Sequence, residues 1–257
     1  SQILRIVWLV PSMDRIWIEG SSGRRQFLDR LTLSYFPEHA EISLSYEKAM
    51  RERNRLLKEK VYNDNWYNAL EIEMAKSAVA IQKARLEAIK YLSEAQNHLT
   101  GKFPKADLLL VDSDKTIITN EEEAIQALRN SRSSDMILGR TSVGPHKSDL
   151  QAVYADKLTL AKDCSTGEQK AILISIILAN AKSLAKISDV SPIVLLDEVS
   201  AHLDKERQAA LYNEICQLGV QAWMTGTGPE LFSELKNKAQ FIEVSTINGV
   251  SALSLAN

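Results

Sequence analysis

The chain has 257 residues, 45% of them hydrophobic and 25% charged, which is the composition of a globular protein with one large core or a core plus an added domain. Its formal net charge of -2 and pI near 6.1 exclude a uniformly basic nucleic-acid protein, so any such contact must come from local patches. Two cysteines without metal-ligand spacing argue against a disulfide framework and a zinc site.

The apolar stretches exclude a membrane protein of the helical kind. The longest, residues 171–181, is too short to span a bilayer, and no signal peptide opens the sequence, so we expect a cytoplasmic protein. The chain has no initiating Met and starts directly in a strand-like pattern. We therefore expect that an upstream portion of the natural protein is missing.

The first elements are a strand over residues 3–10, ended by Pro11, and a helix that follows the loop 20–23. Arg24 and Arg25 lie at the start of this helix, where the helix dipole disfavours cations. They predict a phosphate or carboxylate partner. A solvated pair or an internal salt bridge is an equal alternative.

Apolar residues at helical spacing predict two long helices over 38–60 and 66–99, joined at 63–65 and packed as an antiparallel pair. Arg53 interrupts the apolar stripe of the first helix. That helix carries a local positive excess, which could follow a phosphate backbone. The pattern alone favours a solvated face with Glu–Arg and Glu–Lys pairs. The cations are Lys48, Arg51, Arg53, Arg55, Lys58 and Lys60.

Further along, residues 108–111 predict a short strand and Asn120 a helix start. The loop 139–150, G-R-T-S-V-G-P-H-K-S-D-L, could present Arg140 and Lys147 to phosphate. For its histidine, His146, we expect a structural role, since a lone histidine is usually structural. Residues 150–154 and 158–161 then predict a hairpin.

The central functional motif of the sequence is residues 192–204, P-I-V-L-L-D-E-V-S-A-H-L-D. The apolar run 193–196 predicts a buried strand of a parallel sheet, and ligands bind at the carboxyl end of such strands. Two carboxylates follow there. Asp197 is suited to Mg²⁺, and Glu198 to orienting an attacking water as general base. The alternative without a nucleotide site is a buried strand followed by a solvated acidic turn.

A second candidate functional motif, C-S-T-G-E-Q-K at 164–170, precedes a segment that is as rich in apolar residues as a buried helix. Ser165 and Gly167 fall at the helix start, where free N–H groups and the dipole favour a terminal phosphate. An ordinary Ser–Thr helix cap explains the same residues. The order of the two stretches raises the odds of a nucleotide site.

This ordered set resembles an ABC-type ATPase head, with a signature motif at Ser165–Gln169, a Walker B motif at Ile193–Glu198 and a D-loop at Ser200–Asp204. Within that superfamily the chain resembles the RecF family over nearly its whole length. The matching residues are Pro11, Gly20, Arg24, Arg25, Phe27, Leu28 and Asp29, the loop 139–150, and L-L-D-E-V-S-A-H-L-D at 195–204.

The sequence departs from the RecF pattern at several points. Ser12 replaces a usual acidic residue and Ser22 a usual proline. The segment W-M-T-G-T, residues 223–227, lacks the switch histidine of ABC transporters, so Thr225 or Thr227 is the candidate γ-phosphate sensor. No G-x-x-x-x-G-K-[ST] loop occurs; in RecF-like proteins that loop lies upstream of where this chain begins.

The resemblance implies an α/β fold: the C-terminal part of an ABC-type ATPase head over 1–31 and 133–257, with a helical lid or arm inserted over 32–132. It implies a homodimer that forms on ATP, in which Ser165, Gly167 and Gln169 of one subunit complete the site whose Mg²⁺ is held by the other's Asp197. Glu198 would activate water. Asp204 would couple the two sites.

By the same resemblance, the complete protein is a DNA replication and repair ATPase. It would clamp single- and double-stranded DNA at gaps or junctions and work with RecR and RecO to load RecA in recombinational repair and the SOS response. The candidate DNA or partner contacts are Arg24, Arg25, Arg51, Arg53, Arg55, Arg140 and Lys147.

Two alternatives stay open. The first is a nucleotide-binding subunit of a transporter, which should show a switch histidine and a short helical segment. The second is a non-hydrolysing fragment or binding module. Without a Walker A loop, we expect these 257 residues alone to hydrolyse no ATP.

Overall fold

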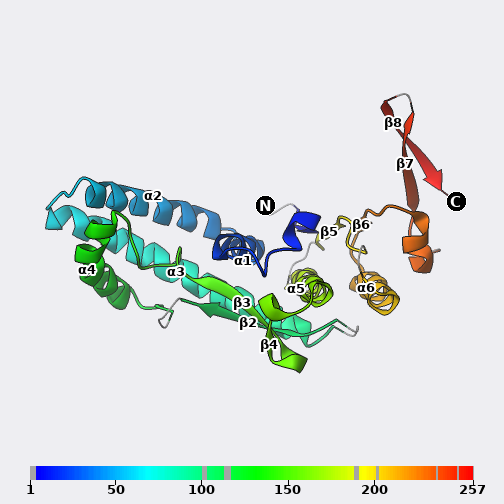
Figure 1. Cartoon of the computed structure of the whole chain (residues 1–257), viewed down its shortest axis with the longest axis horizontal. Coiled ribbons are helices and arrows are strands. Elements are labelled where there is room, and N and C mark those ends of the chain that lie inside the picture. Colours follow the sequence, from blue (N-terminus) through cyan, green and yellow to red (C-terminus); the bar gives the residue numbers. More distant parts are fainter. Residues whose placement is uncertain are drawn as a thin grey trace.

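The computed structural model describes residues 4–99, 103–112, 117–187, 191–200, 203–235, 237–247 and 249–256. The molecule is long, with a helical arm at one end and a projecting hairpin at the other (Figure 1). Within the described residues, every helix is too short or too polar to traverse a lipid bilayer.

A three-stranded parallel sheet in the order β1–β5–β6 carries the central motif. Its strands are β1 (Ile6–Leu9), β5 (Ile193–Leu196) and β6 (Ala222–Met224). Trp8 lies opposite Leu195, which lies opposite Trp223. The predicted α/β class and the parallel strand before Asp197 are confirmed; Ile3, included in the predicted first strand, lies outside the described residues.

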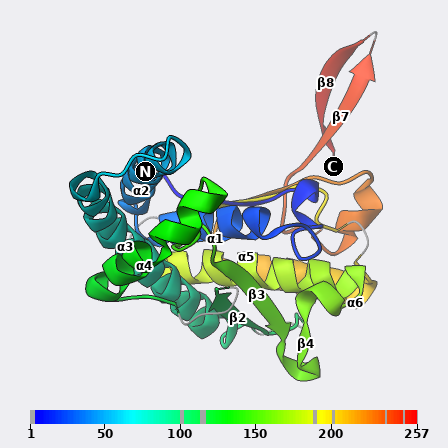
Figure 2. The same cartoon turned by 60° about the vertical axis from the view of Figure 1, so that its left-hand side comes forward.

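Helix α5 (Thr166–Ile187) packs on one face of this sheet and lies between it and a second sheet (Figure 1). A helix that is apolar on all sides must be buried on all sides, and most of α5 is, including Ile172, Leu178 and Leu184. The helix therefore forms the centre of the main core. Figure 2 shows α5 running along the molecule beneath α1 (Ser21–Tyr35), with α6 (Lys205–Leu218) beside it.

The opposite face of the parallel sheet is apolar but exposed. Ile6, Trp8, Leu195 and Trp223 share this face, and between 37% and 54% of each residue is accessible to solvent. The Arg30 guanidinium lies 4.3 Å from the centre of the Trp8 ring and covers part of it. Native parallel sheets are normally covered on both faces, so this surface is unusual.

The second sheet is antiparallel, in the order β2–β3–β4. Its strands are β2 (Ala106–Val111), β3 (Asp149–Tyr154) and β4 (Thr159–Leu160), so the predicted strand and hairpin are confirmed. Residues of β2 and β3, such as Leu108 and Leu150, belong to the main core.

The arm is built from α2 (His39–Lys58), α3 (Asp64–Gln96) and α4 (Glu121–Leu138), and the predicted antiparallel helix pair is α2 with α3. Asn63 and Asn120 cap α3 and α4 through their side chains. Smaller apolar clusters around Tyr46 and Leu57 hold the three helices together. The C-terminal half of α3, with Ala88 and Leu92, packs in the main core and anchors the arm.

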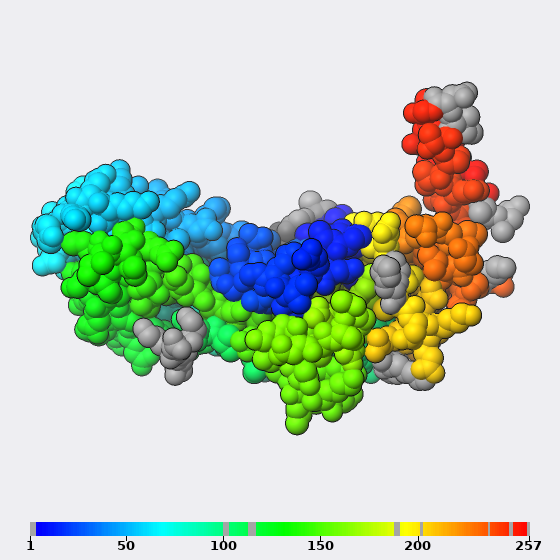
Figure 3. All heavy atoms as spheres, viewed as in Figure 1, coloured from blue at the N-terminus to red at the C-terminus, as the bar shows by residue number. Residues whose placement is uncertain are grey.

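Short 3-10 segments at Pro11–Met13, Ala155–Lys157, Ala161–Asp163 and Pro229–Leu235 link these elements. The chain ends in a hairpin of β7 (Phe241–Ile247) and β8 (Val250–Ala256), which stands away from the body (Figure 3). Ile242, Val244, Leu253 and Leu255 face one side of it and are 44% to 73% exposed.

Candidate nucleotide and nucleic-acid sites

Asp197 and Glu198 lie at the carboxyl edge of the parallel sheet, and both are exposed. The Asp197 N–H donates to the carbonyl of Leu9 at 2.9 Å, which continues the β1–β5 ladder past the end of β5. The strand pairing therefore fixes the backbone of Asp197 while its carboxylate faces solvent.

Thr225 follows β6 and ties these two acidic residues together. Its Oγ1 donates to Asp197 Oδ1 at 2.6 Å and accepts the Glu198 N–H at 3.0 Å. Its own N–H donates to the Leu196 carbonyl. Thr227 is exposed, and no hydrogen bond of this kind joins it to the other residues that the structure describes.

Glu198 has a φ of +48°, in the left-handed region that non-glycine residues rarely adopt. Such a conformation costs about 1–3 kcal/mol and persists only where the surroundings hold it. Two contacts do so here, the hydrogen bond to Thr225 and one from Lys170 Nζ to the Glu198 carbonyl at 3.4 Å. The strained turn directs the Glu198 side chain outward.

Lys170 is a residue that sequence reasoning missed. It is 6% exposed, and its ammonium also pairs with Asp14 at 3.2 Å. Because it lies one turn into α5, it connects the signature segment to the backbone of Glu198 in the same molecule. Its position directly after S-T-G-E-Q could have indicated a role at the site. Its partners, Asp14 and Glu198, are distant in sequence, so the contacts themselves could not be predicted.

Ser165 caps α5 through a reciprocal arrangement with Glu168. Its N–H and Oγ–H donate to Glu168 Oε2 at 2.9 and 2.8 Å, and the Glu168 N–H donates to Ser165 Oγ at 3.4 Å. Lys157 also binds Glu168, and these contacts, with Lys157 the largest, lower the pKa of Glu168 to about 2. Ser165 is nevertheless exposed, so a second molecule can reach it.

Gly167 and Asp204 lie on either side of Arg207. A Cβ at Gly167 would stand 3.7 Å from Arg207 Nη1. The Asp204 carboxylate caps α6 by accepting the Arg207 N–H at 2.9 Å and lies 3.6 Å from its guanidinium. The structure thus brings the signature glycine and the D-loop aspartate to one surface. Ala201 and His202 of the expected D-loop lie outside the described residues.

Gln169, a predicted nucleotide-binding residue, is directed inward. It is 4% exposed, and its Nε2 donates to the carbonyls of Lys162 and Cys164 at 3.3 and 3.0 Å. Its own carbonyl accepts from the Trp17 indole. Gln169 therefore fixes the loop before α5.

Among the basic residues predicted to contact DNA or a partner, Arg24 and Arg53 form ion pairs within the protein. Arg24 forms a bidentate pair with Asp149 at 2.8 Å and donates to backbone carbonyls. Arg53 is 0% exposed and binds Glu71 and Asp135. Both guanidinium groups are therefore occupied by carboxylates of the protein itself.

The remaining cations are accessible to different degrees. Arg55 is exposed and pairs with Glu52 at 2.7 Å, as the solvated-face alternative expects. Arg51 and Arg140 are exposed without a side-chain partner among the described residues. Arg25 is half-buried and donates to Ser21 Oγ and the Ser148 carbonyl. Lys147 is also half-buried.

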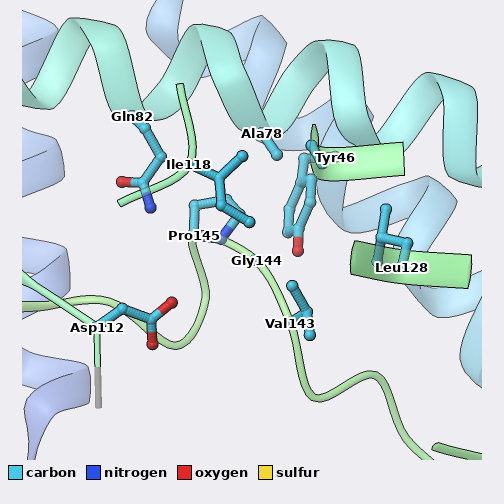
Figure 4. A pocket seen from close by; sticks show the side chains of 10 residues that line it. Tyr46, Ala78, Gln82, Asp112, Ile118, Leu128, Val143, Gly144 and Pro145 are labelled. Carbon is cyan, nitrogen blue, oxygen red and sulfur yellow. The ribbon is translucent and has the colours of Figure 1, made fainter. Parts of the chain in front are cut away.

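His146 has the structural role expected for it. Its Nε2 donates to the Thr141 carbonyl at 3.1 Å, so its Nδ1 accepts the Tyr46 hydroxyl at 2.7 Å. Burial lowers the pKa of His146, helped by the charges of Lys147 and Arg25. Figure 4 shows the Tyr46 ring beside Gly144 at a cavity of about 20 Å³, which is too small for a nucleotide.

The described residues contain no cluster of three or more histidine, cysteine or acidic side chains placed to hold a metal. A Mg²⁺ that is also bound by phosphate oxygens and water needs only one or two protein carboxylates. The exposed Asp197 carboxylate next to the Thr225 hydroxyl fits that requirement.

Known proteins resemble the chain in sequence and fold, although no family model matches it. The DNA replication and repair proteins RecF of Mesorhizobium japonicum and Brucella abortus are each 45% identical over 249 residues, which is 94% of this chain and 66% or 65% of theirs. The RecF protein of Rickettsia akari is 42% identical over 249 residues, 95% of this chain and 69% of that protein. The chain thus spans about two thirds of their length.

Two solved structures, of the recombination mediator protein RecF in the RecFOR pathway, have the same fold. The RecF–ATP and RecF–ATPrS structures match 98% of this chain and 68% of theirs, with TM-scores of 0.79 and 0.78. Their sequence identities are 21% and 20%, so they support the fold alone. On the sequence identities and coverage together, the chain belongs to the RecF family.

Proposed function

We propose that the complete protein is a DNA replication and repair ATPase that dimerises on ATP, and that this chain supplies most of its head. The observation that carries the proposal is the group formed by Asp197, Glu198 and Thr225 at the carboxyl edge of a parallel sheet. ATP is supported by the RecF–ATP structure of the same fold. A phosphate-binding loop upstream of these residues is part of the proposal.

In this proposal each side chain has a separate task. Asp197 holds Mg²⁺, which neutralises charge on the phosphates. Glu198 accepts a proton from the attacking water, and Thr225 detects the terminal phosphate through its hydroxyl. Ser165 and Gly167 of a second molecule close the site. The exposure of Ser165, Asp197 and Glu198 supports this arrangement.

Asp204 provides the link between the two sites of the dimer. Its ion pair with Arg207 places it beside Gly167, which would touch nucleotide bound to the other subunit. A change at one nucleotide can thereby reach α6 of the neighbouring molecule. Arg207 joins the proposed site for the same reason.

We also propose that residues 1–31 and 133–257 form the ATPase head and that 32–132 carries the arm. Two parts depart from these bounds. Strand β2 pairs with β3 and packs in the main core, and the end of α4, residues 133–138, belongs to the arm. The partners proposed are single- and double-stranded DNA at gaps or junctions, RecR and RecO. The outcome is loading of RecA in repair and the SOS response, in the cytoplasm; the names of the curated relatives support the repair role.

Mixing two inactive variants tests the shared site. In the complete protein, Ser165→Arg and Asp197→Asn should each abolish ATP hydrolysis. A mixed dimer contains one site with both residues intact, so random mixing should restore about a quarter of wild-type activity. Glu198→Gln mixed with Asp197→Asn is the matched control and should restore none, because both residues act from the same subunit.

If the first mixture stays inactive although differently tagged subunits co-purify as mixed dimers, the shared site is refuted. If the unmixed Ser165→Arg variant keeps full activity, Ser165 has no part in hydrolysis.

A further inference from the structure

A cleft of about 310 Å³ opens where the arm joins the head, between α1, α2, α3 and the loop before β3. Arg25 enters from α1, Arg51 from α2, Arg85 from α3 and His146 from the loop. The volume is at the lower end of small-molecule sites. It suffices for one phosphate group and its sugar.

The guanidinium groups of the head and arm differ in how they are paired. Arg24 is matched by Asp149 at 2.8 Å, Arg85 by Asp29 at 2.8 Å, and Arg53 by two carboxylates. Arg25 donates only to neutral oxygens, those of Ser21 and Ser148, and makes no ion pair with any residue that the structure describes. Desolvation lowers the pKa of Arg25, although the nearby charges of Asp149 and Asp29 act in the opposite direction.

The rest of the cleft adds positive charge. Its lining holds three guanidinium groups against two carboxylates, and one of those, Asp29, is already bound by Arg85 and His39. The other is Glu47, which is exposed and forms no ion pair with Arg51 in the part of the chain that the structure describes. Burial lowers the pKa of His146 and so favours its neutral form, which adds no charge to the cleft.

We propose that Arg25 and Arg51 grip one phosphodiester of a DNA strand in this cleft, so that the DNA crosses the root of the arm. The proposal rests on the DNA-binding function proposed above and narrows it to one place. Lys147, next to His146, extends the positive surface along the loop. Phosphate contacts fix the position of DNA without reading its sequence, so binding at this cleft is independent of sequence.

The test measures binding of fluorescein-labelled single-stranded and duplex DNA to the complete protein by anisotropy over a range of KCl concentrations. Arg25→Gln and Arg51→Gln should each weaken binding several-fold and lower the salt slope by about one, since one phosphate contact is lost. Arg55→Gln is the matched control. It removes the same charge from the same helix as Arg51, outside the cleft, and should leave the slope unchanged.

Two additions keep the result interpretable. Arg25→Lys retains the charge and should recover most of the salt slope lost in Arg25→Gln. Arg51 is exposed without a partner among the described residues, so Arg51→Gln should fold normally. If Arg25→Gln fails to fold, DNA binding by Arg51→Gln still tests the proposal. Wild-type affinity and slope in Arg51→Gln would overturn the proposal.

A free anion is distinguished from DNA with inorganic phosphate as the probe. If phosphate raises the Tm of the wild type but not of Arg51→Gln, while DNA binds both equally, the cleft holds a free anion and the DNA proposal is wrong. If the wild-type protein binds no DNA at all, the proposed function fails rather than the cleft alone.

Discussion

Arg53 provides the sharpest test of how this structure uses its charges. Its five donors are directed into the arm, where Nε binds Glu71 at 3.1 Å and Nη1 binds Asp135 at 2.7 Å. All three side chains are 0% exposed. Replacing Arg53 by Met keeps the side chain long and apolar but removes the cation between two buried carboxylates.

The cost can be worked out from what each carboxylate retains. Glu71 keeps Arg132, whose Nη2 lies 2.5 Å from it, whereas Asp135 loses its only cationic partner among the described residues. Ser131 and Ser142 still donate to Asp135, but neither brings charge. Leaving one buried charge uncompensated costs about 3–5 kcal/mol. We expect Arg53→Met to lose that much stability.

Urea unfolding followed by circular dichroism measures this loss. Arg55→Met is the control, because Arg55 is an exposed neighbour paired with Glu52, and about 0.5 kcal/mol or less should be lost there. Adding Asp135→Asn to Arg53→Met should recover part of the stability by removing the unpaired charge. Equal losses in Arg53→Met and Arg55→Met would refute the reasoning and place Arg53 on the surface.

Four further outcomes are expected. Lys170→Met should lower the kcat of ATP hydrolysis by the complete protein about tenfold or more while ATP binding persists, since Lys170 positions the Glu198 backbone. Thr225→Val should lower ATP hydrolysis, whereas the matched Thr227→Val should not. Gly144→Ala should cost about 1–3 kcal/mol in urea unfolding, because Gly144 has φ +131° and a Cβ would stand 2.2 Å from the Tyr46 hydroxyl; Gly20→Ala meets nothing within 4 Å and serves as control. Burial alone would raise the pKa of Asp29, but His39 and Arg85 lower it below its ordinary value. The stability this adds is present above the unfolded pKa of about 3.9 and is lost as pH falls through the folded pKa, so the Tm gap between wild type and Asp29→Asn should close in acid.

The sequence predicted the parts of the fold that depend on local pattern. The apolar run 193–196 is strand β5, and the all-round apolar segment after Gln169 is helix α5. Long-range pairing was harder to predict. Arg53 looked like part of a surface run, although it continues the spacing of Tyr46, Ala49 and Leu56 and so lies on the buried side of α2.

At the candidate site the sequence predicted the residue types but not their orientation. Ser165 is both an exposed residue and a helix cap, so the two readings were not exclusive. Gln169 is directed inward because its loop needs a donor. The C-terminal hairpin was missed, although an Asn248–Gly249 pair between alternating apolar residues is a strong hairpin signal.

The uncovered side of the parallel sheet affects how purified material will behave. The two tryptophans there, Trp8 and Trp223, belong to an exposed apolar surface that can associate with a similar surface on another molecule. A chain of these 257 residues prepared alone should therefore stick to itself without ATP. Self-association of this kind would not be evidence for ATP-dependent dimerisation. Only a dimer fraction that rises with ATP concentration is evidence for it.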